Sequence, residues 1–86
     1  MKYLLISFKS RNSIMKFSKT LSNRGIPNNT INTPKTIGST CTLSIKADFQ
    51  YYNQILSLLK LLKIEGFLGL FMIEKTGLVE QTQRLY

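Results

Sequence analysis

Four segments of the chain carry the residue pattern of a β-strand. Apolar and aromatic residues dominate 3–8 and 68–74, and 28–33 is a weaker, polar segment typical of an edge strand. Residues 41–47 alternate strictly between apolar and polar positions, as a strand with one buried face does. The alternation predicts an inward face of Cys41, Leu43 and Ile45 and an outward face of Thr42, Ser44 and Lys46.

Two further segments have the spacing of an amphipathic helix. In the first, Ser10 is the predicted N-cap and Gly25-Ile26-Pro27 the end, because proline cannot continue a helix; its apolar positions are Ile14, Phe17 and Leu21. In the second, Asp48 is the predicted cap of a helix over 49–64, and Gly66 ends it. Its predicted buried stripe consists of Tyr52, Ile55, Leu56, Leu59 and Leu62.

The resulting order, strand-helix-strand-strand-helix-strand, predicts an α+β fold. We expect a ferredoxin-like βαββαβ sandwich, with a four-stranded antiparallel sheet in the order 4-1-3-2 and two helices on one face. Residues 1–75 should form one such domain, and 76–86 a loose polar C-terminal tail. The register predicts that Leu43, Ile45, Leu56 and Leu59 are buried together while Thr42 is exposed.

The charge is unevenly distributed. The formal net charge is +8, and no acidic residue precedes Asp48. Such a basic half suits a nucleic acid, an acidic protein or an anionic substrate, or serves solubility alone. No stretch has the length of a membrane span, and the apolar start at residues 3–8 is too short for a signal peptide, so we expect a cytoplasmic protein.

Candidate chemistry centres on the only cysteine, Cys41. A chain with one cysteine and no histidine is poorly equipped for a metal centre, and no acid–base pair is apparent, so we expect no metal and no independent catalysis. A lone thiol is either a small buried hydrophobe or a reactive group that works alone. In the predicted fold the third strand starts where the first ends and the first helix begins. The thiol should therefore lie near Lys9, Ser10, Arg11, Asn12 and Ser13, whose helix N–H groups and positive charges would lower its pKa.

Several short segments, in this order and spacing, resemble one known family. They are Ile6-Ser7-Phe8-Lys9-Ser10, Gly25-Ile26-Pro27, the stretch from Thr33 to Ile45 that contains Ser39-Thr40-Cys41, and Glu65-Gly66-Phe67. Together they resemble the small bacterial domains described as "putative selenium/sulfur carrier protein-like", over nearly the whole chain up to about Lys75. One departure is Thr42, since the family usually has glycine directly after its cysteine.

The resemblance implies that Cys41 accepts a sulfane sulfur or selenium and transfers it to a partner. A cysteine desulfurase or a similar donor protein would load it. The residues expected to support the thiolate are Lys9, Ser10, Arg11, Asn12, Ser13, Ser39 and Thr40. No cofactor is expected on this chain, because pyridoxal phosphate would belong to the donor.

Two other classes of function remain open. A ferredoxin-like sheet can bind RNA on strand aromatics, but the third strand offers Thr42, Ser44 and Lys46, and Tyr3 is the nearest stacking candidate, so nucleic-acid binding is the less favoured hypothesis. A protein-interaction module is the other possibility. It could be a homodimer joined through an open sheet face that gathers Tyr3, Leu5, Leu68 and Leu70.

Overall fold

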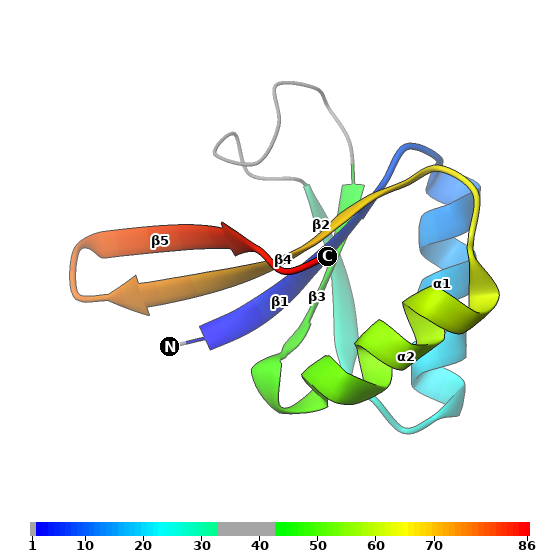
Figure 1. Ribbon diagram of the computed structural model, residues 1–86, viewed down its shortest axis with the longest axis horizontal. Helices are drawn as coiled ribbons and strands as arrows, with labels where there is room; N and C mark the ends of the chain where they lie inside the picture. The colour runs from blue at the N-terminus through cyan, green and yellow to red at the C-terminus, as the bar shows by residue number, and fades with distance from the viewer. Residues whose placement is uncertain (1, 33–42) are drawn as a thin grey trace.

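The computed structural model describes residues 2–32 and 43–86, which form an α+β fold with an antiparallel sheet and two α-helices (Figure 1). The elements are β1 (Lys2–Phe8), α1 (Arg11–Asn23), β2 (Asn28–Asn32), β3 (Leu43–Asp48), the short 3-10 helix η1 (Phe49–Tyr51), α2 (Tyr52–Leu62), β4 (Phe67–Thr76) and β5 (Val79–Arg84). The sheet order is β2-β3-β1-β4-β5, and every neighbouring pair is antiparallel.

The described residues form a sheet of five strands, so the predicted four-stranded sheet is wrong in number. The order of the first four strands is as predicted, and β5 adds to the outer edge of β4. This strand lies within residues 76–86, the segment expected to be a loose polar tail. Its six residues are all exposed, so no apolar face marks it in the sequence. Pairing begins at Thr76 and Val79 across a two-residue turn, in which Gly77 has a positive φ of 61°. The ferredoxin-like assignment itself stays a prediction.

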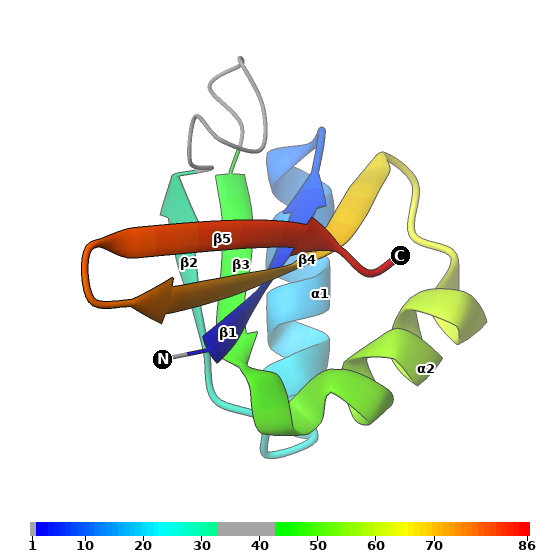
Figure 2. The same ribbon diagram turned by 60° about the vertical axis from the view of Figure 1, so that its left-hand side comes forward.

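Both helices pack on the same face of the sheet and share one hydrophobic core (Figures 1 and 2). The core residues with at most 1% exposure come from β1 (Leu4, Ile6, Phe8), α1 (Ile14, Phe17, Leu21), β3 (Ile45), α2 (Ile55) and β4 (Leu70). Ile45 and Leu59 are buried as predicted, and Leu43 and Leu56 pack partly buried against the same cluster. Leu62 is 43% exposed and was wrongly predicted as buried, because α2 ends at this residue; Leu58 is buried instead.

The helix ends follow from local chemistry. The Ser10 hydroxyl caps α1 by accepting a hydrogen bond from the Asn12 N–H, as predicted. The Asp48 carboxylate accepts from the Gln50 N–H, so it caps η1 rather than α2. Lys63 ends α2 in the left-handed conformation (φ 45°), three residues before the predicted terminator Gly66. Neither described helix is long and apolar enough to cross a membrane.

The sheet face opposite the helices is also covered at its centre. Ser44 is fully buried, although the alternation predicted an outward position, and its hydroxyl lies 2.7 Å from the Ser7 hydroxyl in a buried hydrogen bond. The two serines are paired across β1 and β3, so each satisfies the other's polar group. Leu5 and Leu70 are fully buried as well, Leu70 in the helix-side core. These two residues therefore offer no exposed surface to a partner, and the homodimer through the sheet face stays a prediction.

Candidate functional site

The candidate site lies where β1 ends, α1 begins and β3 starts. Phe8, the last residue of β1, is paired with Leu43, the first residue of β3, and with Phe67 of β4. The predicted meeting of these three segments is therefore present. The sequence-predicted site residues Cys41, Ser39 and Thr40 lie outside the described residues.

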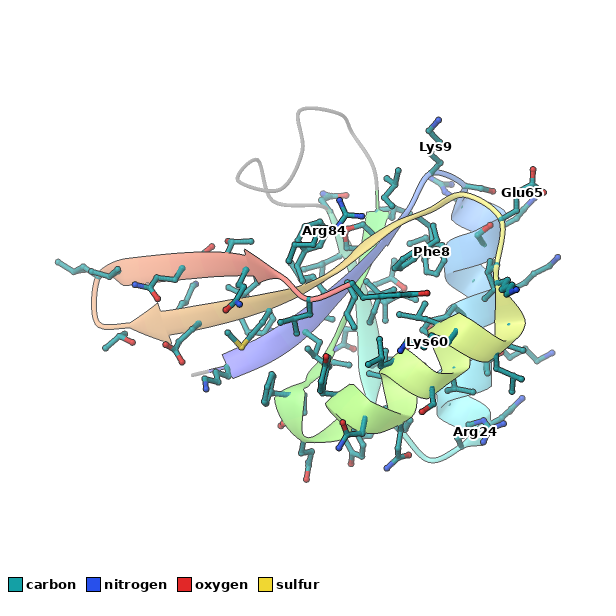
Figure 3. The ribbon with its side chains drawn as sticks, viewed as in Figure 1. Phe8, Lys9, Arg24, Lys60, Glu65 and Arg84 are labelled. Carbon is teal, nitrogen blue, oxygen red and sulfur yellow. The ribbon has the colours of Figure 1, made fainter. Side chains whose placement is uncertain are left out.

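Four of the predicted supporting residues line one groove of about 630 Å³ beside the N-terminus of α1. These are Lys9, Ser10, Asn12 and Ser13, and the groove is completed by Lys16 and by Leu62, Ile64, Glu65 and Gly66 after α2. Arg11 is exposed at the first position of α1 and is not among the lining residues. Figure 3 shows the Lys9 side chain projecting outward from the turn between β1 and α1, with Glu65 on the neighbouring connection.

Hydrogen bonds at this turn correct part of the prediction. The Asn12 N–H is not free, because it donates to the Ser10 hydroxyl at 3.2 Å. The Ser13 hydroxyl is also committed, since it donates to the Glu65 carbonyl oxygen at 2.8 Å. The first turn of an α-helix still carries N–H groups that lack acceptors within the helix, and its end is electropositive. With two lysines and one carboxylate in the lining, the groove suits an anionic group.

The connection between α2 and β4 is the part of the groove that sequence reasoning missed. The Lys9 N–H donates to the Gly66 carbonyl at 2.7 Å, so this connection is held directly against the β1–α1 turn. Gly66 has φ 82°, and a Cβ there would lie 3.5 Å from the Lys9 Cβ. The only sequence signal was the Glu65-Gly66-Phe67 segment, which indicated the end of a helix but not the turn it contacts.

The described residues contain no group of three or more histidine, cysteine, aspartate or glutamate side chains placed to hold a metal ion. The groove itself supplies serine hydroxyls, an asparagine amide, two lysine ammonium groups and the Glu65 carboxylate. These groups can bind and orient an anion.

The aromatic residue proposed for base stacking is already engaged within the chain. The Lys46 ammonium lies 4.5 Å from the centre of the Tyr3 ring, in a cation–π contact. The Lys2 ammonium is placed similarly over Phe49, at 5.3 Å. A nucleobase would have to displace Lys46 to stack on that face of Tyr3. Nucleic-acid binding thus gains no support from the geometry and stays the less favoured prediction.

Comparison with known proteins gives one match. The family model described as "Putative Se/S carrier protein-like" matches residues 3–67, which include Cys41 and all of the predicted supporting residues. Searches of curated proteins and of solved structures gave no significant match. Because the family model covers most of the chain, the protein belongs to the Se/S carrier protein-like family.

Proposed function

We propose that this protein accepts a sulfane sulfur or a selenium atom on Cys41 and transfers it to a partner protein. The family match supports a carrier role in general terms. The observation that carries the specific proposal is the pairing of Phe8 with Leu43, which sets the start of β3 beside the turn that leads into α1. Cys41 precedes Leu43 by two residues, and two residues extend at most about 7 Å.

The proposed transfer is a thiol–persulfide exchange. The Cys41 thiolate attacks the outer sulfur of a persulfide, R–S–SH, on the donor. A new S–S bond forms on Cys41, the S–S bond of the donor breaks, and its electron pair leaves on the donor's thiolate. One thiolate is consumed and one is released, so the step needs no external oxidant or reductant. Delivery to the acceptor repeats the exchange in the opposite sense.

The chain is suited to this exchange in two ways. It has no second cysteine, so a persulfide on Cys41 cannot be lost to an internal disulfide. The α1 N-terminus and the charges of Lys9 and Arg11 would lower the thiol pKa and so raise the thiolate fraction at neutral pH. The donor would be a cysteine desulfurase or a related selenium-releasing enzyme.

Intact-mass spectrometry tests the proposal. After incubation with a cysteine desulfurase and cysteine, the wild-type protein should gain one sulfur atom that dithiothreitol removes. The Cys41→Ser variant should gain none. A wild-type protein that stays unloaded, or a Cys41→Ser variant that loads equally, would contradict the proposal.

Two variants separate the thiol from its surroundings. Lys9→Ala should slow loading without abolishing it, since one helix-end or surface-charge effect is worth about 0.3–1 kcal/mol. Lys19→Ala provides the matched control, because Lys19 is an exposed lysine of α1 that does not line the groove. Equal loading rates for the two lysine variants would show that Lys9 does not assist the thiolate.

A further inference from the structure

The outer edge of β5 is a free strand edge among the described residues. β5 is the last strand in the sheet order, and all six of its residues are exposed. It forms one side of the β4–β5 hairpin, which projects from the body of the fold (Figure 1). We propose that β5 pairs with β5 of a second copy of this chain, antiparallel and about a two-fold axis at Thr82, to give one continuous ten-stranded sheet.

The backbone of β5 is already oriented for this pairing. The Leu85 N–H donates to the Leu70 carbonyl at 2.7 Å, so Leu85 faces β4. In an antiparallel ladder, residues alternate between facing one neighbour and facing the other. Glu80, Thr82 and Arg84 therefore direct their N–H and C=O groups away from β4, toward the free edge. A two-fold axis at Thr82 places these N–H groups opposite C=O groups of the second copy, and these C=O groups opposite its N–H groups.

The side chains of β5 are complementary to themselves in the same register. The segment from Val79 to Leu85 reads Val-Glu-Gln-Thr-Gln-Arg-Leu, so inversion about Thr82 places Glu80 opposite the second copy's Arg84 and Gln81 opposite its Gln83. Opposite charges on directly opposed strand positions stabilise a sheet, and like charges destabilise it. An axis at Glu80 would place the two copies of Glu80 opposite each other. An axis at Arg84 would place the two copies of Arg84 opposite each other. The charges therefore favour the register centred on Thr82. To reach the second copy's Glu80, the Arg84 guanidinium would have to turn from the Leu68 and Tyr86 carbonyl oxygens, to which it donates at 3.2 Å within its own chain.

Two further features fit a second copy as the occupant. The Glu80 carboxylate lies 3.5 Å from the Lys75 ammonium of β4, so in the dimer it would lie between two cations. The hairpin tip carries Leu78 and Val79, which are 106% and 58% exposed. In the dimer this tip would lie beside the C-terminal end of β5 of the second copy, next to that copy's Leu85 and exposed Tyr86. The opposite sheet edge, β2, has no charged residue and no such self-complementary pattern.

Sedimentation equilibrium on the full chain tests the proposal with a charge-reversal cycle. Glu80→Lys and Arg84→Glu should each raise the dimer dissociation constant by about tenfold or more, because each change places like charges at two symmetry-related positions. The double variant Glu80→Lys/Arg84→Glu should restore it to within about threefold of the wild type. Lys19→Glu on α1 changes the net charge as Arg84→Glu does and should leave dimerisation unchanged.

A backbone variant provides an independent test. Thr82→Pro removes an N–H that points to the free edge and no hydrogen bond to β4, so the monomer should stay folded by circular dichroism while dimerisation is lost. Amide exchange in the wild type should show protection of Glu80, Thr82 and Arg84 only at concentrations where the dimer forms. A wild-type monomer at millimolar concentration would overturn the proposal. A dimer unaffected by Thr82→Pro, or not restored by the double variant, would also overturn it.

Discussion

Replacement of Phe8 by leucine should measure how much the aromatic contacts of Phe8 stabilise the core beside the candidate site. Phe8 is fully buried, and its ring centre lies 5.6 Å from that of Phe17 on α1 and 5.7 Å from that of Phe67 on β4. An aromatic pair is worth about 0.5–1.5 kcal/mol beyond its buried area, so losing both contacts should cost about 1–3 kcal/mol. A domain of 86 residues has a free energy of unfolding of about 4–13 kcal/mol, so the variant should fold with clearly reduced stability.

Urea denaturation followed by circular dichroism gives the free energy of unfolding for this comparison. The matched control is Phe71→Leu, because Phe71 is only partly buried and its ring packs against the Arg84 guanidinium. We expect the control to cost less than about 1 kcal/mol, with an unchanged denaturant slope in both variants. If Phe8→Leu were no more costly than Phe71→Leu, the three-ring contact would not be what stabilises the junction of β1, α1 and β4.

Four further predictions concern the Ser10 cap, Gly66, the Cys41 thiol and the basic half of the chain. Ser10→Ala should lower the free energy of unfolding by about 1 kcal/mol through loss of the helix cap, whereas Ser10→Asp should retain most of it in the same urea assay. Gly66→Ala should cost about 1–2 kcal/mol because its φ of 82° is strained for a residue with a Cβ; thermal unfolding that shows no loss would contradict this. Alkylation of Cys41 by iodoacetamide should slow as the pH falls through a thiol pKa below the free value of about 8.5, and a rate equal to that of a model peptide at neutral pH would count against the carrier mechanism. Generic single-stranded RNA should show no sub-micromolar binding at physiological salt, as measured by fluorescence anisotropy across a salt series.

The approach of β3 to the turn before α1 was predictable from the sequence, whereas the hydrogen bonds at that turn were not. The strand order alone brings the start of β3 to the turn before α1, and the observed pairing of Phe8 with Leu43 agrees. The sequence could not show that Ser13 is committed to the Glu65 carbonyl, because that contact joins residues 52 positions apart. The contact of Gly66 with the Lys9 turn is non-local in the same way. Such contacts depend on where α2 ends, and Lys63 ends it in a conformation that few non-glycine residues adopt.

By itself, the sequence determined the elements that a one-sided hydrophobic pattern specifies. The period of Ile14, Phe17 and Leu21, the Ser10 cap and the Gly25-Ile26-Pro27 exit define α1, because each acts within a few residues of the chain. Tertiary structure alone decided the features that lack such a local signal. β5 has no buried face and exists because β4 offers it a paired edge, and Ser44 is buried because Ser7 lies opposite to satisfy its hydroxyl. Burial of a polar group or addition of a polar strand depends on a partner distant in sequence, which local periodicity does not encode.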